Sequence, residues 1–305
     1  MYEVIIQAAI LIGCGVIWQW LKPQGLDGTS LRRHLTGLVY ALLLPALVLV
    51  VLWRAPLGLD SLRVALMAAT SVVTGLVLAR VIYAWKMPGN AAFGALLLAA
   101  AFPNATYMGL PVLEAAFGPW ARSIAIQYDL FACTPLLLSV GILLAARYGG
   151  VAEQTHPLKT LLKVPPLWAA VAGMVLNILQ LPQPELLTGA LDKLAAGVVP
   201  LMLFSLGLGL RWDAHWQRHL LLVLPVVLIQ LLVTPLLIWG LSGVIGLSGD
   251  VRTAVILEAA MPSMVLGIVL CDRYNLDTGL YAMSVTLSTA LSLFTLPFWF
   301  ELVGG

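Results

Sequence analysis

Long apolar segments separated by short polar connections run along the whole chain. A helix needs about 20 apolar residues to cross the hydrocarbon core of a bilayer, and ten segments come close to that length. They cover residues 4–21, 33–53, 62–85, 91–117, 123–146, 161–181, 191–210, 219–241, 251–271 and 278–301. The pattern predicts an all-α polytopic membrane protein with ten transmembrane helices.

The two halves of this pattern resemble each other. Five segments lie in residues 1–146, a connecting loop follows in 147–160, and five more segments lie in 161–305. Each half has a proline in its second segment and another in its fourth: Pro45, Pro103, Pro200 and Pro262. Because five is odd, the second half must be inverted in the membrane, as in many secondary transporters. We therefore expect two inverted five-helix repeats, in which broken helices 4 and 9 cross.

Composition agrees with a membrane protein. Of 305 residues, 61% are hydrophobic and only 10% are charged, against about 25% in soluble domains. The mean hydropathy is +0.99. These values exclude a soluble enzyme and intrinsic disorder. A net charge of +2 is too small to indicate a nucleic-acid partner. Cys14, Cys133 and Cys271 all lie in apolar stretches, where we expect buried, unreactive thiols.

The basic residues predict an orientation. Eleven of the 16 Lys and Arg residues lie in or beside the odd-numbered connections. Cytoplasmic loops are enriched in Lys and Arg. The odd connections are therefore expected inside and both termini outside.

The fourth segment contains a stretch, AFPNATYMGLP, that does not suit a continuous helix. Pro103 and Pro111 each remove a backbone donor and clash with the preceding turn, and Asn104, Thr106 and Tyr107 lie between them. One proline alone would indicate a simple kink. Two prolines with Asn and Thr, matched by a second break in the other half, favour a break that lines a cavity, because unpaired backbone groups are costly in lipid.

The ninth segment breaks in the stretch LEAAMPSMVLG, at Met261, Pro262 and Ser263. Glu258 lies just before this break, at a depth where a carboxylate costs at least ~2.5 kcal/mol on insertion scales. We expect it to face a cavity, a cation or a proton path. The alternative is a glutamate near the helix end that reaches the membrane interface. Asp250 and Arg252 mark the outer end of the segment, which places Glu258 about two turns inside it.

Two crossing broken helices bring the N-terminal ends of two half-helices together. Each end carries about half a positive charge and free N–H donors, which suit a carboxylate, while the opposing carbonyl groups suit a cation. The residues that we expect to bind substrate lie in the two breaks: Pro103, Asn104, Thr106, Tyr107, Pro111, Met261, Pro262 and Ser263.

Both breaks resemble the crossover of a known family. The run PNATYMGLP is similar to the first crossover of the auxin efflux carriers, and EAAMPS with the closing STALSLFTLP is similar to their second crossover and last helix. The resemblance covers essentially the whole chain and suggests a bacterial-type member without the long central loop of the plant carriers. The plant carriers have the order Asn-Pro-Asn, whereas Phe102 precedes Pro103 here, so auxin itself is not implied.

The resemblance implies a fold shared with the bile acid:sodium symporters. Helices 1, 2, 6 and 7 would form a scaffold, and helices 3–5 and 8–10 a transport part that moves in an elevator-type mechanism of alternating access. The implied substrates are small organic anions, auxin-like or dicarboxylate. The implied assembly is a homodimer through the scaffold helices.

Asp129, in the fifth segment, is the second carboxylate at membrane depth. In the related sodium symporters, polar residues of helix 5 and a glutamate of helix 9 share a cation. The resemblance therefore implies that Asp129 and Glu258 couple transport to a cation or a proton, with Met261 and Asn104 as further candidate sodium ligands. Two close carboxylates would favour a proton carrier. The alternative is that Asp129 forms a structural pair with a neighbouring basic group. No resident metal or cofactor is expected.

Other polar residues have plainer interpretations. Glu114 is expected at the membrane interface, Gln230 in an interhelical hydrogen bond, and His215 and His219 in a solvated inner loop. Small-residue pairs that could allow close helix packing are Gly13 with Gly15, and Gly207 with Gly209.

The sequence bears on three classes of function: a transporter, a membrane enzyme, and a channel or sensor. The chain has no Walker motif and so no ATP-hydrolysing site of its own. All four histidines lie in predicted inner loops and no HExxH motif is present, so an enzyme is not expected. The sequence favours a secondary active transporter, and the alternative is a channel or sensor that binds a small carboxylate.

Overall fold

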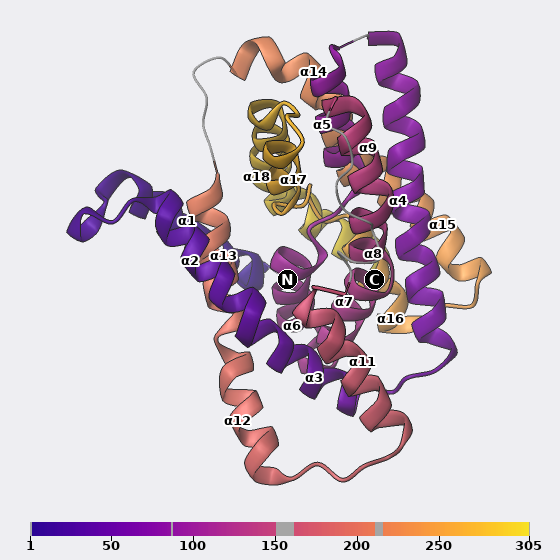
Figure 1. Cartoon of the computed structure of the whole chain (residues 1–305). Helices are drawn as coiled ribbons and strands as arrows, with labels where there is room; N and C mark the ends of the chain where they lie inside the picture. Colours follow the sequence, from indigo (N-terminus) through magenta and orange to yellow (C-terminus); the bar gives the residue numbers. More distant parts are fainter. Residues whose placement is uncertain (1, 87, 151–161, 211–215, 305) are drawn as a thin grey trace.

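The computed structural model describes residues 2–86, 88–150, 162–210 and 216–304. Within these ranges the chain is helical, and the one β-type pairing is an isolated antiparallel bridge between Pro103 and Ser263. The prediction of an all-α protein is confirmed (Figure 1). Most of the expected inner loop, residues 151–161, lies outside the described residues, as do Arg211 and His215.

The helices follow one another with short connections. The first half contains α1 (Tyr2–Leu21), α2 (Gly28–Leu38), α3 (Leu44–Arg54), α4 (Leu59–Lys86), α5 (Asn90–Ala101), α6 (Leu110–Phe117), α7 (Arg122–Tyr128), α8 (Thr134–Leu136) and α9 (Ile142–Gly149). The second half contains α11 (Pro165–Ile178), α12 (Glu185–Ala196), α13 (Val198–Gly209), α14 (Trp216–Leu228), α15 (Thr234–Val244), α16 (Gly249–Ala259), α17 (Gly267–Arg273) and α18 (Thr278–Gly304).

Six continuous helical stretches among the described residues are long and apolar enough to cross a membrane. They are Gly28–Arg54, Leu59–Lys86, Pro119–Gly149, Glu185–Gly209, His219–Val244 and Thr278–Gly304. Shorter apolar helices cover Ile6–Leu21, Asn90–Ala101 and Pro165–Ile178.

Several boundaries differ from the sequence-based expectation. The seventh segment begins at Glu185 rather than 191, directly after Pro184. His219 lies in helix α14, so its placement in a loop was wrong. Cys14 is exposed on α1, so the expectation of a buried thiol was wrong there, because α1 presents that face away from the protein core.

In the part of the chain that the structure describes, five π-turns widen the helices, and four of them have a physical cause in the sequence. They are η2 (Val39–Leu43), η3 (Ala105–Gly109), η5 (Asp129–Cys133), η6 (Leu137–Gly141) and η7 (Ile229–Val233). All but η6 are followed by a proline at the second position of the next helix: Pro45, Pro111, Pro135 and Pro235. A proline ring clashes with the carbonyl one turn earlier and donates no N–H. The wider turn accommodates both defects without ending the helix.

Both expected breaks are present. Helix α5 ends at Ala101 and the chain becomes helical again at Ala105, while α16 ends at Ala259 and α17 begins at Gly267. The bridge between Pro103 and Ser263 joins the two breaks, so they lie side by side at one point of the molecule.

The helices pack in two groups (Figure 1). In the first packing group, α1 lies along α13, α11 lies along α3, and α12 and α13 contact α3 and α2. In the second packing group, α4 lies along α5, α15 along α16, and α18 contacts α5, α14 and α16.

Close helix contact in the first packing group depends on two glycines. A Cβ on Gly15 of α1 would lie 2.9 Å from the Cα of Gly207 on α13, and a Cβ on Gly207 would lie 3.0 Å from the Cα of Gly15. The backbones therefore touch directly. Gly13 faces open space, so only one glycine of that pair makes the expected close contact.

Two amide side chains cap the ends of neighbouring helices. Asn177, on α11, donates from Nδ2 to the carbonyls of Leu52, Trp53 and Ala55 at the end of α3, at 2.8–3.0 Å. Gln19, on α1, donates from Nε2 to the carbonyls of Gly207 and Leu210 at the end of α13, at 2.8 and 3.1 Å. Each amide satisfies carbonyls that the helix end leaves without an intrahelical partner.

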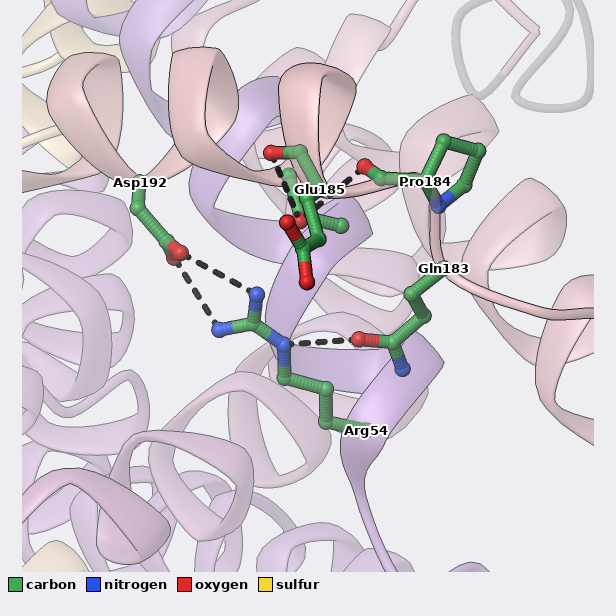
Figure 2. Close-up of polar contacts among 6 residues, drawn as sticks. Arg54, Gln183, Pro184, Glu185 and Asp192 are labelled. Carbon is green, nitrogen blue, oxygen red and sulfur yellow. Dashed lines mark hydrogen bonds and ion pairs between the residues drawn. The ribbon is translucent and has the colours of Figure 1, made fainter.

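Figure 2 shows a second connection at the end of α3. Arg54 donates to both carboxylate oxygens of Asp192 on α12, at 3.0 and 3.1 Å, and to Oε1 of Gln183 at 3.0 Å. Both charged side chains remain nearly half exposed, so this pair orients α12 on α3 more than it stabilises the fold.

Candidate functional site

The two broken segments supply each other's missing backbone partners. The N–H of Asn104 donates to the carbonyl of Pro262 at 2.8 Å, and the N–H of Met264 donates to the carbonyl of Phe102 at 2.8 Å. The crossing therefore contains no long stretch of unpaired backbone, as a break in a membrane requires.

Further hydrogen bonds hold Ser263 in place. Its Oγ donates to the carbonyl of Ala99 at 2.7 Å, and its N–H donates to Oγ of Ser288 on α18 at 3.1 Å. The same Ala99 carbonyl accepts from Nε2 of Gln230 at 3.2 Å, which is the interhelical hydrogen bond expected for Gln230. Ala99 lies in the last turn of α5, where carbonyl groups lack intrahelical partners.

A cavity of about 60 Å³ lies beside the crossing. This is several times the ~10–15 Å³ that one water needs. It is lined by Tyr40, Leu44, Asn104, Thr106, Tyr107, Asp129, Leu130, Thr134, Leu137, Leu138, Val164, Pro166, Met264 and Leu266. Tyr40 and Leu44 come from the first packing group, whereas Asn104 and Asp129 come from the broken fourth segment and the helix after it. Residues of four π-turns thus meet at one cavity, and such turns are frequent at functional sites.

The predicted substrate-binding residues divide into two sets in this structure. Asn104, Thr106 and Tyr107 line the cavity. The remaining five are not among the lining residues and lie within the crossing or its flanking helices: Pro103, Pro111, Met261, Pro262 and Ser263. Of these five, Pro103, Pro262 and Ser263 make contacts within the crossing itself.

Asp129 faces the cavity and is 5% exposed. One carboxylate oxygen accepts a hydrogen bond from Oγ1 of Thr106, and the other accepts from Oγ1 of Thr134 at 2.8 Å. The partners observed for Asp129 are therefore threonine hydroxyls, and the alternative of a structural pair with a basic group is not what the described residues show.

The π-turn η5 explains the contact between Asp129 and Thr134. The N–H of Thr134 donates to the carbonyl of Asp129, five residues earlier, because Pro135 widens this turn. That spacing stacks the two side chains on the same face of the helix.

Glu258 is completely buried beside the crossing, so the alternative of an interfacial glutamate is wrong. Neither of its oxygens has a hydrogen-bond partner among the described residues. Its carboxylate lies against Gly109, where an added Cβ would be 2.7 Å from Cδ of Glu258. A buried carboxylate without partners is costly, which marks this position as a candidate site for a cation or a proton.

Asn104 ends the first break and is 1% exposed. Neither its Oδ1 nor its Nδ2 has a partner in the described part of the chain, although it lines the cavity. The carbonyl of Asn104 accepts from the N–H groups of Met108 and Gly109. A helix therefore begins at Ala105. Its first turn contains the N–H groups of Ala105, Thr106 and Tyr107.

The comparison with known families agrees with this geometry. The family described as membrane transport protein matches residues 20–300. The chain belongs to this family, that of the auxin efflux carriers. The resemblance carried by the two crossover motifs is confirmed.

Relatives within the auxin efflux carrier family are also named as transporters. A protein of Methanothermobacter thermautotrophicus named as an uncharacterized transporter is 32% identical over 302 residues, covering 97% of this chain and 96% of its own length. Another of that name, from Methanocaldococcus jannaschii, is 27% identical over 214 residues, covering 68% of this chain and 67% of its own. The protein is a multi-pass membrane transporter and not an enzyme.

No group of three or more His, Cys, Asp or Glu side chains that could hold a metal ion occurs among the described residues. The two membrane carboxylates interact electrostatically but do not form a shared cluster with a third acidic, His or Cys side chain.

Glu114 has a partner that the sequence did not indicate. It forms an ion pair with Arg122, across the turn at Gly118, and both side chains are largely buried. This pair joins the end of α6 to the start of α7.

Sequence reasoning missed several cavity residues, above all Tyr40 and Thr134. Tyr40 lies in the π-turn before Pro45, and Thr134 directly precedes Pro135. The signal that could have found them is a membrane proline, because four of the π-turns are followed by one at the second position of the next helix. The apolar lining residues carry no such signal, because leucines occur throughout a membrane chain.

Proposed function

We propose that this member of the auxin efflux carrier family is a secondary active transporter of a small organic solute that carries a carboxylate. The observation that carries the proposal is the cavity at the crossing, where a buried and unpartnered Asn104 and the first turn of a half-helix meet. Such a helix end attracts a carboxylate, and Asn104 can donate to it.

The inverted repeat belongs to the same proposal and is supported by matched contacts in the two halves. Gln19 on the first helix caps the end of the seventh, and Asn177 on the sixth caps the end of the second. The breaks near Pro103 and Pro262 also pair with each other. Repeats of this kind place the substrate site where the two halves meet.

Elevator-type alternating access is supported by the origin of the cavity walls. The first packing group corresponds to the expected scaffold helices 1, 2, 6 and 7, and the second to the expected transport part. Tyr40 and Leu44 would belong to the scaffold, while Asn104 and Asp129 would move with the transport part. Relative movement of the groups would then expose the solute on alternate sides of the membrane.

Coupling to sodium or protons is proposed for Glu258, with Asp129 within electrostatic range. The support is that Glu258 is buried, unpartnered and next to the crossing. The proposal also includes an orientation with both termini outside, a location in a bacterial inner membrane and a homodimer that forms through the scaffold helices. Light scattering of the detergent-purified protein tests the dimer.

The crossing is tested by Asn104→Ala and Pro262→Ala in proteoliposomes. Asn104→Ala removes the unpartnered amide, and we expect roughly tenfold weaker transport, equivalent to ~1.4 kcal/mol of binding. Pro262→Ala alters the break and should impair transport while membrane expression persists. Gly13→Ala, on a face that meets open space, is the control. Full transport by both crossing variants would refute a crossover site.

A channel or sensor is the second candidate, because broken helices also occur in channels. Saturable uptake distinguishes a carrier from a channel. Current that rises linearly with solute concentration, without saturation, would favour the channel.

A further inference from the structure

The charge of the cavity does not match a simple anion. Asp129 presents a carboxylate to it, and among the described residues that line it there is no Lys, Arg or His. An anionic solute would be repelled by this carboxylate at short range, where the surrounding protein screens charge poorly. When Asp129 is ionised, a positively charged group of the solute would balance it.

Asp129 is held between two threonine hydroxyl groups. Both oxygens accept from threonine hydroxyls, Thr106 on one side and Thr134 on the other. A carboxylate has about four acceptor positions, so two remain for a ligand. Tyr40, Tyr107, Cys133 and Glu258 interact with it electrostatically from the elements around it, and none of them is a cation.

The cavity also has an end that suits a carboxylate. The helix from Ala105 to Phe117 begins there, and the N–H groups of its first turn lie at its positive end. A second and independent feature points the same way. The Asn104 amide is 1% exposed, lines the cavity and has no partner among the described residues.

The two ends are next to each other. Thr106 belongs to the first turn of that helix, and its hydroxyl donates to Asp129. The carboxylate of Asp129 therefore lies next to the positive end of the helix, with Thr106 as the contact between them. A solute whose amine and carboxylate sit on the same carbon atom can present the two groups to two such adjacent sites.

The remaining walls are mainly apolar, apart from the hydroxyl groups of Tyr40 and Tyr107. They consist of aliphatic side chains from both packing groups with two tyrosine rings: Tyr40, Leu44, Tyr107, Leu130, Leu137, Leu138, Val164, Pro166, Met264 and Leu266. They offer no further charged partner, so a second carboxylate, as in a dicarboxylate, would be left uncompensated.

One cation lies near the cavity without lining it. Arg32, on α2, interacts electrostatically with Tyr107, and its guanidinium lies against Gly209, where an added Cβ would be 3.0 Å from it. It is not among the residues that line the cavity, and its charge can attract an anion towards it.

We propose that the transported solute is an apolar amino acid or a close analogue, which carries a protonated amine as well as a carboxylate. The amine binds Asp129, the carboxylate binds Asn104 and the first turn of the helix at Ala105, and the apolar side chain fills the remaining space. This inference rests on the proposed function and names its substrate class.

Binding of three solutes with one carbon skeleton tests the inference. Purified wild-type protein is titrated with leucine, with isocaproate, which lacks the amine, and with isoamylamine, which lacks the carboxylate. Ligand binding raises the midpoint of thermal unfolding, and calorimetry gives the affinities. We expect leucine to bind at least about tenfold more tightly than either analogue.

Asp129→Asn tests whether Asp129 is the residue that binds the amine. This variant keeps the size of the side chain and can still accept from one threonine, and it should lose the preference for leucine over isocaproate. Asp250→Asn, which removes the same charge from an exposed position at the start of α16, should keep the preference. Thr134→Val, which removes one support of Asp129, should weaken the preference without abolishing it.

The outcomes separate the inference from the proposed function. If isocaproate binds as tightly as leucine, or if Asp129→Asn keeps the preference, the amine site is refuted while a carboxylate transporter stands. If isoamylamine binds as tightly as leucine, the carboxylate end is refuted, and the proposed function fails with it. If none of the three binds, the inference is refuted, and succinate and acetate then test whether any carboxylate is bound.

Discussion

At the scale of single residues, the most telling contact is between Gly109 and Glu258. Glycine is required at position 109 because a side chain there would overlap the carboxylate of Glu258. The glycine thus fixes how closely the broken fourth segment approaches α16, and it determines where the one completely buried carboxylate of the crossing lies.

Gly109→Ala should displace Glu258. We expect a cost of about 1–3 kcal/mol in stability, typical of overpacking, together with an altered dependence of transport on sodium or pH. Thermal unfolding and uptake assays measure both. Gly37→Ala makes the same substitution in helix α2 at a position with open space, and it should leave both unchanged or slightly raise stability. Equal behaviour of the two variants would show that the Gly109 contact is unimportant.

Glu258→Gln tests the coupling role directly. The substitution keeps the shape of the side chain and removes its charge, so no cation or proton is needed to balance it. We expect solute binding to persist and the effect of a sodium or proton gradient on uptake to disappear. Uptake measured with each gradient applied separately gives the result. An unchanged dependence on both gradients would place coupling elsewhere.

Some of these residues could be predicted and others could not. Asn104, Thr106 and Glu258 stand out because polar groups are expensive in a membrane and therefore have a reason to be there. Tyr40 and Thr134 were not recognised, because the one local signal is the proline that follows each of them, and prolines such as Pro225 and Pro297 lie inside helices without a widened turn before them. The place of Tyr40 and Thr134 at the cavity depends on how separate helices pack, which the local sequence does not contain.

At the scale of helices, the breaks near Pro103 and Pro262 were predictable from backbone chemistry alone, since a proline cannot donate to the preceding turn. Their pairing across the molecule was expected from the matched halves. The π-turns were not predicted, although Pro45, Pro111, Pro135 and Pro235 each follow one. A proline indicates a disturbed turn but does not specify whether the helix breaks, kinks or widens.

Asn177 and Arg54 each connect helices of the first packing group, and substitution of each shows which connection contributes more to stability. Asn177→Ala removes one amide that serves three carbonyls, and leaving buried carbonyls unpaired costs about 1–3 kcal/mol. Arg54→Ala removes an exposed ion pair, which contributes about 0–1 kcal/mol. We expect Asn177→Ala to lower the midpoint of thermal unfolding more than Arg54→Ala does. The opposite order would show that the ion pair in Figure 2 carries the stability.

At the scale of the whole molecule, composition and apolar segments were sufficient to predict an all-helical membrane chain, and the two crossover motifs were sufficient to predict its family. The arrangement of the helices into two packing groups, with a cavity between them, depends on contacts between distant segments such as α1 with α13 and α11 with α3. Because of this arrangement, the apolar helices form a cavity between the two packing groups, which makes the protein a candidate carrier.

Counterflow in proteoliposomes tests the central claim, a carrier with its site at the crossing, most directly. Vesicles are loaded with an excess of unlabelled leucine, isocaproate or succinate, and the entry of a trace of the same labelled compound is followed. The account predicts that the label rises transiently above its equilibrium level for at least one compound and that Asn104→Ala abolishes this overshoot. Entry without an overshoot for all three compounds, or an overshoot unchanged in Asn104→Ala, would contradict it.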